Sequence, residues 1–314
     1  MLALALGVFL AGCATLTPGI DEFIGAGFDE PFLARARPVE ILPVDPLSAE
    51  LESYYARIER DRVASGLMRT DNGASEGAPS TTRLADIYMD VALREEHARG
   101  PTGFGGSANS VLRRWEAPVT YAVEFGSTVG RAQRLQDYRQ ISQLVSRLAA
   151  ASGHPIQLAP LGSDQGNFYV LVLSESERRN AGPRLRALVP GIDDVAVRMI
   201  TDMPRETFCM AMAFSRGTSA VYTVAVAVIR AEHPDLTRLA CYNEELAQGL
   251  GLAADSDGAR PSIFNDDQEF ALITDQDLML LRMHYDPRLR PGMTAVRARP
   301  LIFSIASELA AGDS

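Results

Sequence analysis

The feature that most limits the fold of this chain is an apolar run followed closely by a helix that carries polar side chains. The run Ala220–Ile229 predicts a β-strand, and the spacing of apolar residues after it predicts a helix over Leu236–Leu250. Within this helix lie two adjacent glutamates, Glu244 and Glu245, followed by Gln248. Residues four apart share a helix face, so Glu244 and Gln248 would point the same way. A strand joined to a helix by a short connection favours a fold that mixes sheet and helices.

Earlier segments predict further strands and helices in a mixed order. Alternating or apolar runs predict strands over Val119–Phe125, Ile156–Leu158 and Phe168–Leu173. Apolar residues at helical spacing predict a helix over Leu135–Leu148, and a short arginine-rich helix is expected over Glu175–Leu188. We therefore expect an α+β domain over residues 81–303, with a twisted mixed sheet, a backing helix and then the helix of Glu244. Residues 48–80 are expected to form a preceding helix and a polar linker.

The predicted helix resembles the active-site helix of metzincin peptidases with its histidines replaced. In those enzymes a His-Glu-x-x-His helix holds zinc with two histidines, and the glutamate acts as general base. The stretch Asn-Glu-Glu-Leu-Ala-Gln-Gly-Leu-Gly has Glu244 and Gln248 at the two histidine positions. By the same resemblance Glu245 keeps the position of the base, and Gly251 keeps that of a glycine at which the chain turns. The fold implied by this resemblance is a zincin-like domain.

The resemblance extends past the helix, although the third metal ligand is missing. The third-ligand position falls on Ala254, which has no donor atom, and Asp255 is its neighbour. Metzincins follow this helix with a Ser-Ile-Met turn and a capped helix that ends near a tyrosine. The chain has Ser262-Ile263-Phe264, then a helix expected from Thr274 to Tyr285.

The same residues are also similar to a proteobacterial family of lipoproteins of unknown function. The shared pattern is Cys-Tyr-x-Glu-Glu-x-x-Gln-x-Leu-Gly-Leu, followed by Pro-Ser-Ile-Phe-Asn-Asp. This similarity covers about the last two-thirds of the chain, whereas the metzincin-like part covers only residues 236–286.

The ligand types argue against ordinary zinc proteolysis. Zinc prefers imidazole or thiolate, while carboxylate and amide oxygens suit Ca²⁺, Mg²⁺ or Mn²⁺. We therefore expect no cofactor, or a divalent metal held by Glu244, Gln248 and Asp255. Three hypotheses remain open: a non-catalytic domain that binds an extended peptide or an envelope component, an atypical metal-dependent hydrolase with Glu245 as base, and a purely structural lipoprotein.

The first residues predict export and attachment to a membrane. Residues 1–12 form an apolar run too short to span a bilayer, which is typical of a signal peptide, although no Lys or Arg precedes it. Leu10-Ala11-Gly12-Cys13 resembles a lipobox, so we expect acylation (palmitate) at Cys13; a plain signal peptide is the alternative. A tether would follow over residues 13–47. Ala14 is not Asp, which favours an outer-membrane lipoprotein that faces the periplasm.

Charge and cysteine content restrict the partners and the compartment. A net charge of -10 argues against a nucleic-acid partner, because phosphate binding needs a basic field. The remaining cysteines, Cys209 and Cys241, would meet an oxidising periplasm and are expected to form a disulfide; two buried free thiols are the alternative.

Overall fold

The computed structural model describes residues 46–95, 99–100, 103–104, 108–265 and 267–312. The expected signal peptide, Cys13 and nearly all of the expected tether lie outside these residues. The described chain begins with α2 (Pro46–Ala64), so the last two residues of the predicted tether are helical. A short 3-10 turn, η2 (Ala74–Glu76), lies in the predicted polar linker.

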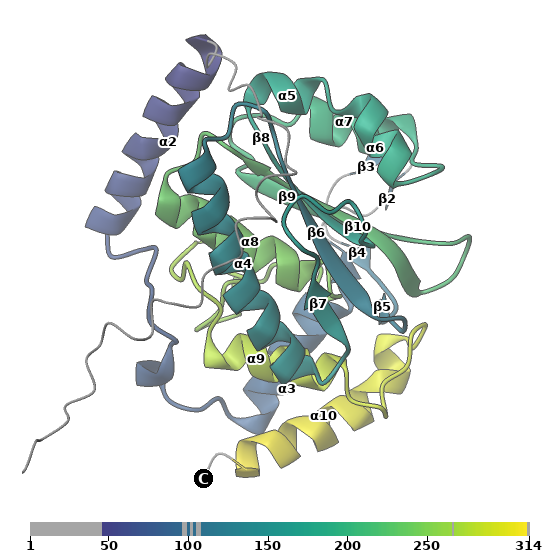
Figure 1. Cartoon of the computed structure of the whole chain (residues 1–314). Coiled ribbons are helices and arrows are strands. Elements are labelled where there is room, and N and C mark those ends of the chain that lie inside the picture. Colours follow the sequence, from purple (N-terminus) through teal and green to yellow (C-terminus); the bar gives the residue numbers. More distant parts are fainter. Residues whose placement is uncertain (1–45, 96–98, 101–102, 105–107, 266, 313–314) are drawn as a thin grey trace, which may run out of the picture. The chain divides into compact units, whose positions relative to one another are not determined.

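The centre of the described chain is a mixed sheet (Figure 1). Its parallel strands, in spatial order, are β5 (Arg114–Trp115), β10 (Val221–Arg230), β8 (Phe168–Leu173), β6 (Val119–Phe125) and β7 (Ile156–Leu158). Strand β9 (Cys209–Ser215) runs antiparallel to β10. Ala225 of β10 is paired with Phe168 of β8 and with Ala213 of β9, so β8 and β9 flank β10 on opposite sides.

Helices cover both faces of the sheet because the strand side chains alternate between two cores. Along β10, Ala225, Ala227 and Ile229 belong to one apolar cluster, while Val226 and Val228 belong to the other. The first cluster packs against α3 (Thr81–Ala92), α4 (Arg131–Ser152), α8 (Asp235–Gln248), α9 (Asp275–His284) and α10 (Ala295–Gly312). The second packs against α6 (Gly182–Leu188) and α7 (Asp194–Thr201), which follow α5 (Glu175–Arg179).

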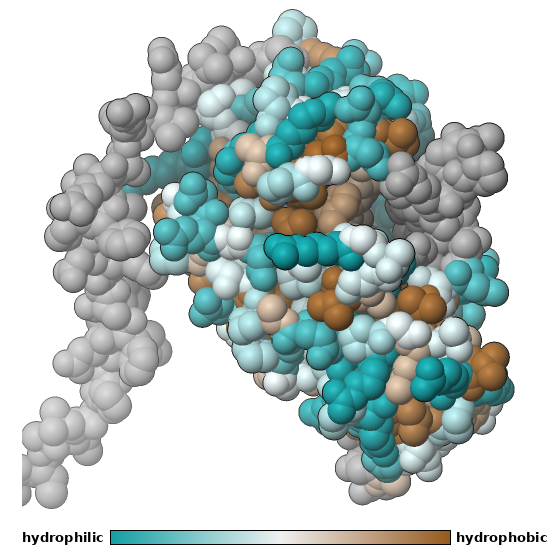
Figure 2. Space-filling model, turned by 90° about the vertical axis from the view of Figure 1, so that its right-hand side faces the viewer, coloured by the Kyte–Doolittle hydropathy of each residue, from teal (hydrophilic) through white to brown (hydrophobic). Residues whose placement is uncertain are grey.

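Two small two-stranded sheets complete the described structure. β1 (Arg94–Glu95) pairs with β4 (Ala108–Asn109), and β2 (Arg99–Gly100) pairs with β3 (Gly103–Phe104). Exposed large apolar residues are few among the described residues: Leu47, Val63 and Val296. Figure 2 likewise shows hydrophobic residues in small groups between hydrophilic ones on the face it presents.

The α+β prediction is confirmed, and the predicted strands 119–125, 156–158 and 168–173 match β6, β7 and β8. The predicted helix over Glu175–Leu188 is wrong as a single helix. It is divided into α5 and α6, because a new helix begins at Gly182 with a proline in its first turn. Strand β9 was not predicted.

The expected disulfide is confirmed. Cys209, at the start of β9, is bonded to Cys241 on α8, with Cα atoms 5.9 Å apart. The bond attaches the edge of the sheet to the helix of Glu244. None of the helices in the described residues combines the length and apolar character that a bilayer span requires.

Candidate functional site

Helix α8 is held at its C-terminal end by aromatic donors from other elements. The last carbonyls of a helix have no partner within the helix and must find one elsewhere. The Tyr121 hydroxyl donates to the Leu246 carbonyl, the Trp115 indole N–H to that of Gly249, and the Tyr285 hydroxyl to that of Leu250, each at 2.9 Å. These three bonds fix the end of α8 against the sheet and against the end of α9.

The other end of α8 is held by α2. Oε2 of Glu59 accepts hydrogen bonds from the backbone N–H of Thr237 at 2.8 Å and from its hydroxyl at 2.7 Å. A carboxylate at a helix N-terminus satisfies free N–H groups and complements the helix dipole. Helix α2 is therefore attached directly to the first turn of the candidate site helix.

Gly251 follows α8 at a position that only glycine fits. Its φ is +124°, and a Cβ atom there would lie 2.2 Å from Nε2 of His284 and 2.5 Å from the carbonyl oxygen of Arg113. Nε2 of His284 donates to that carbonyl at 2.9 Å, and Nδ1 faces the Tyr88 hydroxyl at 3.0 Å. Glycine is therefore required at this turn, because His284 and the Arg113 carbonyl leave no room for a Cβ atom.

The Ser262-Ile263-Phe264 segment is held by one buried carboxylate. Asp277 accepts from the Ser262 hydroxyl at 2.5 Å, from the Ile263 backbone N–H at 3.1 Å and from both donors of Thr274 at 2.8 Å. Thr274 and Asp277 also form the capping box that begins α9. Complete burial raises the pKa of Asp277 to about 6, although these hydrogen bonds act in the opposite direction.

A cleft lies along the first turns of α8. It is small: the cavity volume is about 20 Å³, which is room for about one water molecule. Glu244 supplies a carboxylate, Phe208 and Phe270 supply aromatic rings, and Cys209 and Cys241 supply the disulfide. The remaining lining residues are Met68, Thr237, Ala240, Ile263 and Gln268. A single carboxylate thus stands among mostly apolar and aromatic walls.

Most of the residues around this cleft fall within the span of a known family. A sequence profile for the family described as "Protein of unknown function (DUF2927)" matches residues 81–303. The chain belongs to this family. A search of curated proteins found no match. Helix α2 lies before the matched span, and the Glu244 cleft is built mainly from residues inside it.

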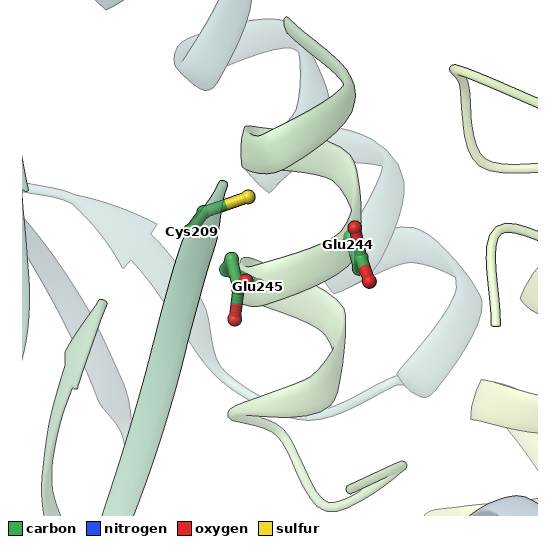
Figure 3. Close-up of side chains that lie close together, drawn as sticks. All are labelled: Cys209, Glu244 and Glu245. Atoms are coloured by element: carbon green, nitrogen blue, oxygen red, sulfur yellow. The ribbon is translucent and has the colours of Figure 1, made fainter. Parts of the chain in front are cut away.

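In this member of the family, the predicted metal-site residues make the following contacts. Gln248 donates from Nε2 to Oδ1 of Asp255 at 2.9 Å, so these two side chains lie together. Oxygens of Glu244 and Glu245 and the sulfur of Cys209 all lie within 4.8 Å of one another. Figure 3 shows Glu245 on the side of α8 that faces the strand of Cys209, with Glu244 at the neighbouring position. The group that contains Glu244 does not include Asp255.

The donor set at Glu244 does not fit a zinc ion. The Cys209 sulfur is part of a disulfide and is not a thiolate, so two carboxylates remain from this group. Ala254, at the expected third-ligand position, is buried and has no donor atom. Catalytic zinc needs three protein ligands and an open position for water.

Sequence reasoning did not identify most of the cleft. Met68, Phe208, Gln268 and Phe270 are distant from Glu244 along the chain, and the sequence carries no motif that joins them. One signal was available: the expected disulfide predicts that the segment around Phe208 lies against the start of the Glu244 helix.

Proposed function

We propose that this protein is a lipid-anchored cell-envelope protein whose domain binds an extended peptide without cleaving it. The observation that carries the proposal is the cleft of Glu244, which lies on α8 directly beside the start of strand β9. The domain would be a degenerate relative of zincin-like metallopeptidases that keeps a binding cleft and lacks zinc ligands.

Several structural features support the zincin-like part of the proposal. A mixed sheet, the backing helix α4 and the site helix α8 occur in the order expected from the resemblance. The turn glycine, the Ser262–Phe264 segment and the capped helix α9 follow in the expected sequence. These features support a shared architecture and say nothing of catalysis.

An extended peptide suits this cleft because of the strand beside it. Within the described residues, β9 is paired with β10 and with no other strand. A strand with one unpaired edge can take up a peptide as an additional strand, with main-chain hydrogen bonds giving affinity and side-chain pockets giving specificity. Cys209 belongs to β9 and also lines the cleft, so a peptide along β9 would place one side chain near Glu244.

Catalysis is disfavoured by the donors present. Without an imidazole or thiolate at the positions of Glu244 and Gln248, a zinc ion would not be held, and water would not be activated by the usual route. The alternative function is that of a hydrolase in which Glu245 is the general base and oxygen ligands hold a metal ion. A purely structural role is the third possibility, and it predicts that no ligand binds.

Anchoring rests on the sequence of the N-terminal segment. Acylation of Cys13 would attach the protein to the outer membrane, and the tether over residues 13–47 would separate the domain from the lipid surface. Labelling with radioactive palmitate tests this part directly. The wild-type chain should be labelled and Cys13→Ser should not; labelling of both, or of neither, would contradict the anchor.

The binding function is tested with the full chain in detergent, immobilised peptide arrays and metal analysis. We expect a subset of peptides to bind and to be recovered intact, and less than stoichiometric metal after incubation with zinc, calcium and manganese. Stoichiometric metal that disappears in Glu244→Ala, or peptide cleavage that disappears in Glu245→Gln, would replace the proposal with the hydrolase. An array with no bound peptide would favour the structural role.

A further inference from the structure

Strand β9 forms an edge of the mixed sheet that lacks the usual protection against pairing with another chain. Within the described residues it pairs with β10 alone (Figure 1). Exposed edge strands of soluble proteins are usually short, or carry charged side chains or proline. β9 runs over seven residues, Cys209–Ser215, and contains neither a charge nor a proline. Such an edge offers main-chain hydrogen-bonding groups to a further strand.

Both faces of β9 are apolar up to the edge. Ala211 and Ala213 pack against the first apolar cluster, and Met212 and Phe214 pack against the second. All four side chains are nevertheless partly exposed. Because a residue on an added strand contacts the opposite residue on the same face, a matching strand carries small or apolar residues at successive positions. β9 itself has this composition, so a second copy of the chain supplies such a strand.

Charges at the two ends of β9 favour the antiparallel pairing of two copies. Glu206 precedes the strand and Arg216 follows it, and both are exposed. Glu206 has its neighbour Arg205 as a surface partner at 3.0 Å, whereas Arg216 forms no ion pair among the residues that the structure describes. In an antiparallel pair the start of one strand lies beside the end of the other. Glu206 of each copy would therefore lie beside Arg216 of the other.

We propose that two copies of the protein associate through β9, with the two strands antiparallel and the two-fold axis beside Ala211. This register places Ala211 opposite the same residue of the second copy, and Met210 opposite Met212. It also places Glu206 opposite Arg216 twice, once on each side of the axis, as a two-fold interface requires. The paired strands join the sheets of the two copies into one continuous sheet.

This association goes beyond the proposed function, although both depend on the same edge of β9. The unpaired side of a strand accepts one further strand at a time. An extended peptide and a second copy therefore exclude each other. The protein is expected to be dimeric at high concentration and to dissociate as a peptide occupies β9.

The test is sedimentation equilibrium of the full chain in density-matched detergent over a range of protein concentrations. The wild type should change from monomer to dimer as the concentration rises. Glu206→Arg and Arg216→Glu should each raise the dimer dissociation constant at least about fivefold, because each replaces two attractive charge pairs by two repulsive ones. The double variant Glu206→Arg/Arg216→Glu restores opposite charges and should return the constant to within about twofold of the wild type. Glu52→Arg, the same charge change at an exposed position of α2, is the matched control and should leave the constant unchanged.

A chain that stays monomeric at every concentration would overturn the inference. Equal dissociation constants for the wild type and Glu206→Arg, or no recovery in the double variant, would refute pairing through β9. A peptide that binds in the array should dissociate the dimer, and a dimer that persists at saturating peptide would refute the shared edge. If the charge-dependent dimer forms and no array peptide binds, the proposed function fails while the association stands. If peptides bind to a chain that forms no dimer, the association fails while the proposed function stands.

Discussion

Replacement of Gly251 by alanine is a sensitive test of how the candidate site is built. The backbone at Gly251 has φ of +124°, a conformation that residues with a Cβ rarely adopt. An added Cβ would also lie 2.2 Å from Nε2 of His284 and 2.5 Å from the Arg113 carbonyl oxygen. Nε2 of His284 donates a hydrogen bond to this carbonyl oxygen at 2.9 Å, and the added methyl group would break it.

The cost follows from two contributions. Holding a non-glycine residue in such a region costs about 1–3 kcal/mol. Leaving a buried donor or acceptor without its partner costs about another 1–3 kcal/mol. We therefore expect Gly251→Ala to lower the free energy of unfolding by about 2–6 kcal/mol, with the end of α8 displaced from His284.

Gly258→Ala is the matched control. A Cβ there would meet only the Ser256 hydroxyl oxygen, at 3.5 Å, and the backbone has no positive φ. This change should alter stability by less than about 1 kcal/mol. Urea unfolding of both variants, followed by circular dichroism, measures the difference. If Gly251→Ala is within about 0.5 kcal/mol of Gly258→Ala, the close packing of His284 against the turn is refuted.

Three further predictions concern stability. Glu175→Gln would leave the buried guanidinium groups of Arg178 and Arg230 without their shared counter-charge, so we expect a loss of about 3–5 kcal/mol in urea unfolding; a loss below about 1 kcal/mol would contradict the buried ion pairs. Burial lowers the pKa of His233 and of His284 to about 3 in the folded protein. Below about pH 6.5 the unfolded chain therefore binds protons that the folded chain does not, and the free energy of unfolding falls as the pH falls. The raised pKa of Asp277 has the opposite effect, because protonation of this carboxyl favours the folded state below about pH 6. The net expectation is that the free energy of unfolding falls by roughly 2–3 kcal/mol between pH 7 and pH 5. Equal stability at the two pH values would show that the histidines are not buried in the neutral form. Reduction of the disulfide, which closes a sequence separation of 32 residues, should lower the free energy of unfolding by about 3–4 kcal/mol, and an unchanged midpoint with dithiothreitol would argue against the bond.

The sequence predicted those elements whose local pattern agrees with their final environment. β10 is a nearly continuous apolar run because it is buried on both faces, and α4 ends at Gly153 with a φ of +65°. The disulfide was predictable because the N-terminal sequence predicts export to an oxidising compartment. In each case the prediction depends on a few neighbouring residues or on the compartment expected for the protein.

The missed features depend on contacts between distant residues. The β9 sequence Cys-Met-Ala-Met-Ala-Phe-Ser contains no β-branched residue and has weak strand preference, so only its pairing with β10 makes it a strand. Arg114 lies beside Arg113 in the sequence, which by itself is typical of surface charge. It is buried, because its guanidinium donates to the carbonyls of His284 and Asp286. Neither partner is visible in the local sequence.

The candidate site shows the same division. Glu244, Glu245 and Gly251 could be selected from the motif, and the structure adds a reason for the glycine. The cleft itself could not be predicted, because Met68 and Phe270 reach it through tertiary packing.

Photo-crosslinking tests the central claim of peptide binding at the Glu244 cleft most directly. A peptide selected from the array and carrying a benzophenone is bound to the full chain and irradiated, and the crosslinks are mapped by mass spectrometry. We predict crosslinks to Met68, Phe208 or Phe270, loss of these crosslinks in Glu244→Gln, and no cleaved peptide. Crosslinks that map away from the cleft, or that persist in Glu244→Gln, would contradict the account.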